Sequence, residues 1–365
     1  PSLIGKFPQP TNRYDEYVMM HMLSFGEDEN LTMIAHGSPT FLPWHRAYLR
    51  YIEREIQRIK PEYKDVTIPY WDWTSKKSTE AVWDIELMGG DGRESDWRVM
   101  DGKFAYDTGN WKLYTAESVN SSYKRPDLCR RFGYRKVDGV IRNPPTIPTA
   151  DSVANTLKEN PYDQPPWDGN SQPSFRNRLE VLLHNPVHVW VGGWDSTGDQ
   201  INQCGAMSYG GSPNDPVFWL HHANIDRLWA DWQLNQEHWI MEHKGYQPLS
   251  GGPVNMNVND PMLPWHPTIS ITPARVANFY KIDSKGYKYV RYCRNTTKDR
   301  EEQQQMDSSS EVTMIPPTAP PTAPPSAAPI ADDSLLVNFD SIRSSGDDLV
   351  NILRKPLFPL LGDSL

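Results

Sequence analysis

The apolar positions of the N-terminal part of the chain recur with a helical period. Asn12 can cap a helix that continues to about Phe25, and Pro43 can occupy the first turn of a second helix that ends before Pro61. This second helix runs through the stretch RAYLRYIEREIQRIK. The pattern predicts two helices joined by a turn and followed by a short strand or packed loop at residues 68–73, IPYWDW.

Helical periodicity returns in the second half of the chain. Apolar residues recur at helical spacing from Ser174 to Val191, and again in VFWLHHANIDRLWADWQ, where Asp215 can cap the helix and Pro216 can take its first position. Between these regions, residues 76–170 are rich in Gly, Pro, Asp and Asn and show weak periodicity. We therefore expect a mainly α fold, whose helical core is wrapped by long loops and short β-strands.

The composition changes near the C-terminal end. GYKYVRY (286–292) alternates like a strand, whereas PPTAPPTAPPSAAP (316–329) has seven prolines and is typical of an extended polyproline linker. The apolar residues that follow predict at most a short amphipathic helix. These changes predict a core domain at residues 1–298, a polar and Pro-rich linker at 299–330, and a C-terminal tail at 331–365.

Charge and cysteine usage narrow the class of protein. Lys and Arg number 37 against 46 Asp and Glu, and a net charge of −9 argues against a nucleic-acid partner or an anionic membrane surface. No apolar run approaches the roughly 18 residues of a membrane span. The three cysteines are widely spaced and lack a CxxC motif, which argues against a Cys-based zinc site and a disulfide-framework fold.

The N-terminus and the glycosylation sequons bear on the cellular location. The chain starts at Pro1 rather than Met, so we expect a processed or trimmed product in which any signal peptide would no longer be visible. Three N-x-S/T sequons begin at Asn30, Asn120 and Asn295, which favours a secreted glycoprotein.

Seven of the ten histidines fall in the predicted helices or next to them, in two groups. HGSPTFLPWHRAYL sets His36 and His45 among apolar residues, and HNPVH places His184 and His188 on one helix face, where both can bind one metal ion. A zinc-protease motif would need Glu after the first histidine, but Asn185 stands there. Burying so many imidazoles without a metal is costly, and all-imidazole ligation suits copper, zinc, iron or nickel.

Three segments together resemble the copper A and copper B signatures of the tyrosinase family: HGSPTFLPWHRAYL, FRNRLEVLLHNPVHVWVGG (175–193) and SPNDPVFWLHHANIDRLW (212–229). This type 3 copper family includes catechol oxidases and molluscan haemocyanin units. The resemblance spans most of residues 12–290 and implies a four-helix bundle that holds two copper ions, with O2 as co-substrate. Matched position by position, it implies copper A ligands His21, His36 and His45, and copper B ligands His184, His188 and His222.

Residues beside the implied ligands have candidate supporting roles. A ligating histidine usually donates its other ring N–H to a carboxylate or carbonyl, and Asp226 stands one turn beyond His222. Asp226 could instead be a charge on the helix surface that pairs with Arg227 or a neighbour. We expect His221 to form hydrogen bonds beside the metal rather than to bind it.

Two phenylalanines stand one helical turn before a ligand: Phe41 before His45, and Phe218 before His222. Both could pack against the metal site or simply fill the core.

In the family, an Asn directly after the first copper B histidine, together with an upstream Glu, is associated with holding a water that deprotonates monophenols. Asn185 occupies this position, and Glu180 is the nearest candidate for the acid. Glu180 could alternatively form a salt bridge with Arg176 or Arg178.

The resemblance implies a copper-dependent oxidoreductase that uses O2 to ortho-hydroxylate monophenols, to oxidise o-diphenols to o-quinones, or both. Its substrate would be a small phenol or a peptidyl tyrosine. One alternative is a catechol oxidase that lacks the hydroxylase activity. Another is a non-enzymatic O2-binding or structural matrix protein, although the presence of all six ligands argues against a degenerate relative.

Overall fold

The structure, a computed structural model, describes residues 7–24, 35–115, 125–141, 145–195, 205–235 and 245–262. These residues all belong to one compact unit of the chain. The predicted strand at 286–292, the linker at 299–330, the tail at 331–365 and the three sequons lie outside the described residues.

The first two predicted helices are confirmed. Helix α1 spans Arg13–Leu23, and the side chain of Asn12 accepts a hydrogen bond of 2.9 Å from the backbone N–H of Asp15. Helix α2 spans Phe41–Ile59 and contains Pro43 in its first turn, where a backbone N–H has no partner to lose.

The chain then passes through the 3-10 turn η2, Pro61–Tyr63, into the IPYWDW segment. This segment is a packed loop rather than a strand, and the N–H of Trp71 in it donates to the carbonyl of Leu220 at 3.0 Å.

A helical rod of three parts replaces the single helix expected from Ser174 onward. Helix α6 covers Phe175–Arg178, the π-helical turn η3 covers Leu179–His184, and helix α7 covers Asn185–Gly192. In a π turn the hydrogen bonds reach one residue further along the chain. Pro186, which has no N–H to donate, follows this turn after one intervening residue, Asn185.

Helix α9, Val217–Asn235, follows two 3-10 turns, η4 (Ala206–Ser208) and η5 (Ser212–Asn214). As expected, Asp215 serves the start of this helix, and its Oδ1 accepts the N–H of Val217 at 3.3 Å. Its carboxylate also accepts two hydrogen bonds from Arg130, at 2.7 and 2.8 Å, and both side chains are fully buried. The loops that precede α6 are thereby fastened to α9.

The region expected as loops with small strands also contains short helices. A hairpin turn at Asp138 and Gly139, both with positive φ, joins β1 (Arg135–Val137) to its antiparallel neighbour β2 (Val140–Ile141), and β3 (Trp194–Asp195) pairs with β1 in parallel. The short elements are α3 Lys76–Val82, α4 Tyr106–Gly109, α5 Ala150–Thr156, β1 Arg135–Val137, β2 Val140–Ile141 and β3 Trp194–Asp195.

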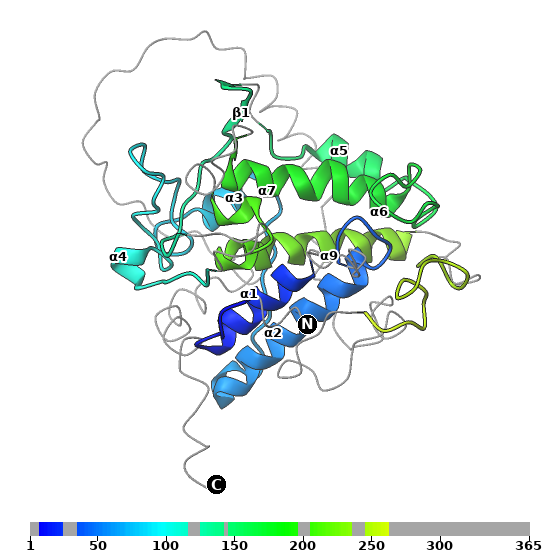
Figure 1. Ribbon diagram of the computed structural model, residues 1–365, viewed down its shortest axis with the longest axis horizontal. Coiled ribbons are helices and arrows are strands. Elements are labelled where there is room, and N and C mark those ends of the chain that lie inside the picture. Colours follow the sequence, from blue (N-terminus) through cyan, green and yellow to red (C-terminus); the bar gives the residue numbers. More distant parts are fainter. Residues whose placement is uncertain are drawn as a thin grey trace, which may run out of the picture. The chain divides into compact units, whose positions relative to one another are not determined.

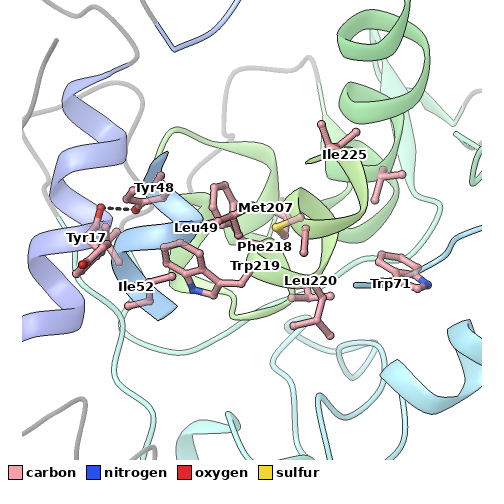
Figure 2. Packing of buried hydrophobic residues seen from close by; sticks show 14 of the residues in the cluster. Tyr17, Tyr48, Leu49, Ile52, Trp71, Met207, Phe218, Trp219, Leu220 and Ile225 are labelled. Carbon is pink, nitrogen blue, oxygen red and sulfur yellow. Dashed lines mark hydrogen bonds between the residues drawn. The ribbon is translucent and has the colours of Figure 1, made fainter. Parts of the chain in front are cut away.

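Figure 1 shows α1 beside α2, with α9 between this pair and the α6–α7 rod. Aromatic and aliphatic side chains pack together between the helices (Figure 2). Tyr48 of α2 donates to the carbonyl of Tyr17 in α1 at 2.6 Å, and its ring centroid lies 4.7 Å from that of Trp219 in α9. The expected mainly α architecture, a four-helix bundle with few short strands, is confirmed. None of the described helices combines the length and the hydropathy needed to cross a bilayer.

Asp215→Ala should lower the free energy of unfolding by about 3–5 kcal/mol, because it leaves the Arg130 guanidinium buried without its carboxylate. Urea unfolding would measure the change. Asp231→Ala on the same helix is a matched control, since its pair with Arg227 is partly exposed and should contribute below about 1 kcal/mol. Equal losses of unfolding free energy in the two variants would show that the buried pair of Asp215 with Arg130 stabilises the fold no more than the partly exposed pair does.

Candidate metal centre

The first group of histidines comes from two helices and the turn between them. His21 lies on α1, His36 lies in the turn before α2, and His45 lies on α2. Their ring centroids are 5.0 Å apart for His21–His36 and for His36–His45, and 5.6 Å apart for His21–His45. One ring nitrogen of each lies within 4.8 Å of the others, so the three can bind one metal ion.

The second group joins the α6–α7 rod to α9. The Nε2 atom of His222 lies 3.3 Å from the Nε2 atoms of both His184 and His188. Three nitrogens placed about 2.0–2.1 Å from a tetrahedral metal ion would be spaced by about 3.3 Å. Both pairs of nitrogens therefore have the separation that a shared metal ion requires.

The two groups face each other across a short gap. His45 and His222 stack with their centroids 4.2 Å apart and an interplanar angle of 12°. Phe41 packs against both groups, with its centroid 5.0 Å from that of His45 and 4.8 Å from that of His184. Phe218 lies 4.1 Å from His222 by the same measure. Both phenylalanines are fully buried, so they line the gap as well as filling the core.

Oxygen acceptors fix the orientation of four rings through their Nδ1 atoms. Because a carbonyl oxygen can only accept, each Nδ1 must carry the proton, which leaves Nε2 with its lone pair free for a metal. The pairs are His21 with Gly210 O at 2.6 Å, His45 with Phe41 O at 2.9 Å, His188 with Met207 O at 2.7 Å and His184 with Asn185 Oδ1 at 2.8 Å.

One loop orients a histidine of each group. Met207 and Gly210 stand three residues apart in the segment that includes η4, and their carbonyls hold His188 and His21 respectively. Sequence reasoning missed these acceptors, because every residue has a backbone carbonyl and its direction leaves no mark in the sequence.

Burial keeps the imidazoles neutral. Loss of solvation lowers the pKa of His21 to about 3 and that of His188 to about 4. Burial also lowers the pKa values of His45 and His222, and the neighbouring imidazoles lower them further. Neutral imidazole is the form that binds metal, so the site is prepared for a metal ion at neutral pH.

The donor set fits copper. The Nε2 atom of His45 is buried and has no hydrogen-bond partner among the described residues, a costly arrangement that a bound metal ion would relieve. Imidazole nitrogens without carboxylates suit copper among the biological metals, whereas Mg and Ca prefer oxygen ligands.

Glu180 and Asn185 both have protein partners. The two carboxylate oxygens of Glu180 accept hydrogen bonds from the N–H of Gly37 at 2.6 Å and from Arg176 Nη1 at 3.0 Å, so the salt bridge with Arg176 is present. Asn185 is exposed, and its Oδ1 orients His184. The water-holding role of the two residues stays a prediction.

Asp226 is buried and is not a surface residue. Its carboxylate accepts a hydrogen bond from Nε of Arg46, whose guanidinium lies 3.8 Å from the ring centroid of Trp229. The Nδ1 atom of His222 has no hydrogen-bond partner among the described residues, so the contacts do not support Asp226 as its acceptor. Arg46 attracts the carboxylate because a buried guanidinium requires a counter-charge.

His221 lies beside the second group as a fourth imidazole. It is fully buried, its ring stacks on that of His184 at 5.1 Å with an interplanar angle of 17°, and Trp73 lies 5.3 Å away.

Known proteins share this sequence pattern. The family model for the common central domain of tyrosinase matches residues 11–235. The tyrosinase of Streptomyces glaucescens is 39% identical over 264 residues, which cover 71% of this chain and 84% of the relative. That of Streptomyces antibioticus is 40% identical over 270 residues, 72% of this chain and 85% of the relative. A solved tyrosinase of Burkholderia thailandensis aligns with a TM-score of 0.45 at 19% identity, over 76% of this chain and 69% of the other.

The two facing histidine groups define a dicopper oxidoreductase of the type 3 class. The chain belongs to the tyrosinase family. It is a copper-dependent enzyme that uses O2 to oxidise phenols, and both non-enzymatic alternatives are disfavoured.

The copper-free protein should lose stability as the pH falls from about 6.5 to about 4. In this window the histidines of the unfolded chain take up protons, whereas the buried ones, with pKa values of about 3 for His21 and about 4 for His188, stay neutral. The unfolded state then binds more protons, and each such histidine costs roughly 1.4 kcal/mol per pH unit.

Urea unfolding of the copper-free protein at about pH 7.5 and about pH 5.5 would measure this slope. His188→Gln should reduce the stability difference between these two pH values by roughly 1.4 kcal/mol, because the histidine of the unfolded chain takes up most of one proton between them. An unchanged slope in that variant would show that His188 titrates normally in the folded protein.

Proposed function

We propose that this enzyme acts on both monophenols and o-diphenols, and that each histidine group binds one copper ion. The copper A ligands are His21, His36 and His45, and the copper B ligands are His184, His188 and His222. The observation that carries this proposal is the convergence of ring nitrogens in two groups that face each other. In rings such as those of His21 and His45, the other nitrogen of the same ring, Nδ1, is held by an oxygen acceptor. When bound, the copper pair supplies the redox chemistry that couples reduction of O2 to oxidation of the phenol.

The protein's own contribution begins with a rigid, largely dry site. Phe41 and Phe218 are fully buried against the histidine rings and exclude water from the gap. His45 and His222 are almost completely buried, whereas His188 is only partly buried and Asn185 is exposed. The phenol therefore approaches from the side of the site formed by His188 and Asn185.

Hydroxylation of a monophenol requires removal of the phenolic proton. Asn185 stands on the open side, and the hydrogen bond from His184 holds its Oδ1, which leaves its amide N–H groups to bind a water. Each carboxylate oxygen of Glu180 has a second lone pair beyond its protein hydrogen bond. A water held by these two residues would take up the proton.

The substrate class follows from the open side and from the relatives. The partly exposed His188 leaves room for a phenol presented on a larger molecule, such as a peptidyl tyrosine. The tyrosinase names of the relatives at 39% and 40% identity support L-tyrosine as a free substrate.

Oxygen uptake by the copper-loaded protein tests the proposal, with L-tyrosine, L-DOPA and a tyrosine-containing peptide supplied separately. Uptake is expected with all three, and His222→Ala should reduce it to the level of the copper-free protein because one copper ion loses a ligand. Uptake with L-DOPA alone would restrict the enzyme to catechol oxidation. Full activity of the His222→Ala protein would contradict the ligand set.

Asn185→Ala should lower the rate with L-tyrosine at least about 10-fold while changing the rate with L-DOPA far less, because only the monophenol depends on the water as a base. Asn177→Ala, in α6 of the same rod, is the control and should change neither rate. Equal losses with both substrates would assign Asn185 to the orientation of His184 alone.

A further inference from the structure

A hydrogen bond outside the metal gap joins the chain segments that carry the two histidine groups. Glu180 belongs to the π turn that carries His184, and its Oε1 accepts the N–H of Gly37 at 2.6 Å. Gly37 directly follows His36 in the chain. A carboxylate on the copper B rod is thus bonded to the backbone of the copper A turn.

The position of His36 depends on such a hydrogen bond more than the positions of the other ligands do. Each of the other five proposed ligands lies within a helix, whose backbone hydrogen bonds fix its position. His36 lies in an irregular turn, and Gly37 adopts a φ of 56°, a left-handed conformation that favours glycine. The N–H that this conformation directs toward the rod is the one that Glu180 accepts.

A buried charge network holds Glu180 itself in place. Its Oε2 accepts a hydrogen bond from Arg176 Nη1, one helical turn earlier. Arg176 also donates two hydrogen bonds to Asp163, at 2.9 and 3.0 Å, and one to the carbonyl of Asp168 at 3.0 Å. Arg176 and Asp163 are fully buried, and Glu180 nearly so. Its carboxylate therefore has little freedom to move away from Gly37.

We propose that Glu180 is a positioning residue that holds the His36–Gly37 turn against the copper B rod and so sets the geometry of the copper A site. This inference rests on the proposed ligand set and adds a structural role for Glu180 that is separate from water binding. It follows that loss of the carboxylate should weaken copper A selectively, although Glu180 lies on the rod that carries copper B ligands.

Two half-site proteins allow each copper to be measured alone. His222→Ala retains the complete copper A group, and His45→Ala retains the complete copper B group. Copper affinity, measured by competition with a chelator, is then compared with and without Glu180→Ala, and circular dichroism verifies that the helices remain folded. Removal of a group that orients a metal ligand typically costs 10–100-fold in affinity, and we expect a loss of about this size for copper A only.

Glu180→Gln serves as a milder variant. It retains an acceptor oxygen for Gly37, and Arg176 keeps both bonds to Asp163, so the loss at copper A should be smaller than in Glu180→Ala but still selective. The matched control is Glu53→Ala on α2. Glu53 is also buried, accepts the N–H of Ile68 at 3.0 Å and pairs with Arg50, but its variant should leave both affinities unchanged.

The outcomes separate this inference from the proposed function. Failure of the unmodified protein to bind two copper ions would overturn the ligand set itself. Two bound copper ions, with equal losses or no losses in the two half-site proteins, would overturn the positioning role of Glu180 and leave the ligand set intact.

Discussion

The structure depends on the burial of many neutral imidazoles whose ring nitrogens face one another. An imidazole nitrogen without a partner in an apolar interior costs free energy, so such a cluster requires the surrounding structure to hold its rings in place. Here the fixation comes from the Nδ1 side, where carbonyl or amide oxygens hold four rings with their Nε2 atoms turned inward. A copper ion in each group then replaces the hydrogen bonds that the inner nitrogens lack.

Buried ion pairs hold the elements that carry these rings. Arg46 of α2 pairs with Asp226 of α9. Arg130, which lies in the loop before β1, pairs with Asp215 at the start of α9. Arg176 joins the rod to Asp163 in the same way. A buried guanidinium without its carboxylate is strongly unfavourable, so each pair tolerates only one relative placement of its two elements. Such pairs suit a site in which two metal ions must stay at a fixed separation.

Much of the site could be predicted from its residues. The helical spacing placed His184 and His188 on one face, and the structure brings the Nε2 atoms of both within 3.3 Å of His222. The adjacent histidines His221 and His222 were harder to tell apart, because His221 lies beside the same group and stacks on His184. Asp226 has the predicted spacing on the helix, but Arg46, which comes from another helix, donates a hydrogen bond to its carboxylate.

The sequence by itself determined the local features: the caps at Asn12 and Asp215, the long helices, and the imidazoles that face inward from them, because helical periodicity and capping act over a few residues. Only the tertiary structure decided what lies behind those imidazoles. The carbonyls of Met207 and Gly210, and the backbone N–H of Gly37 that donates to the Glu180 carboxylate, join segments distant in the chain. The folded path of the chain sets the direction of these backbone groups, and the residue types of Met207 and Gly210 do not encode where their carbonyls point.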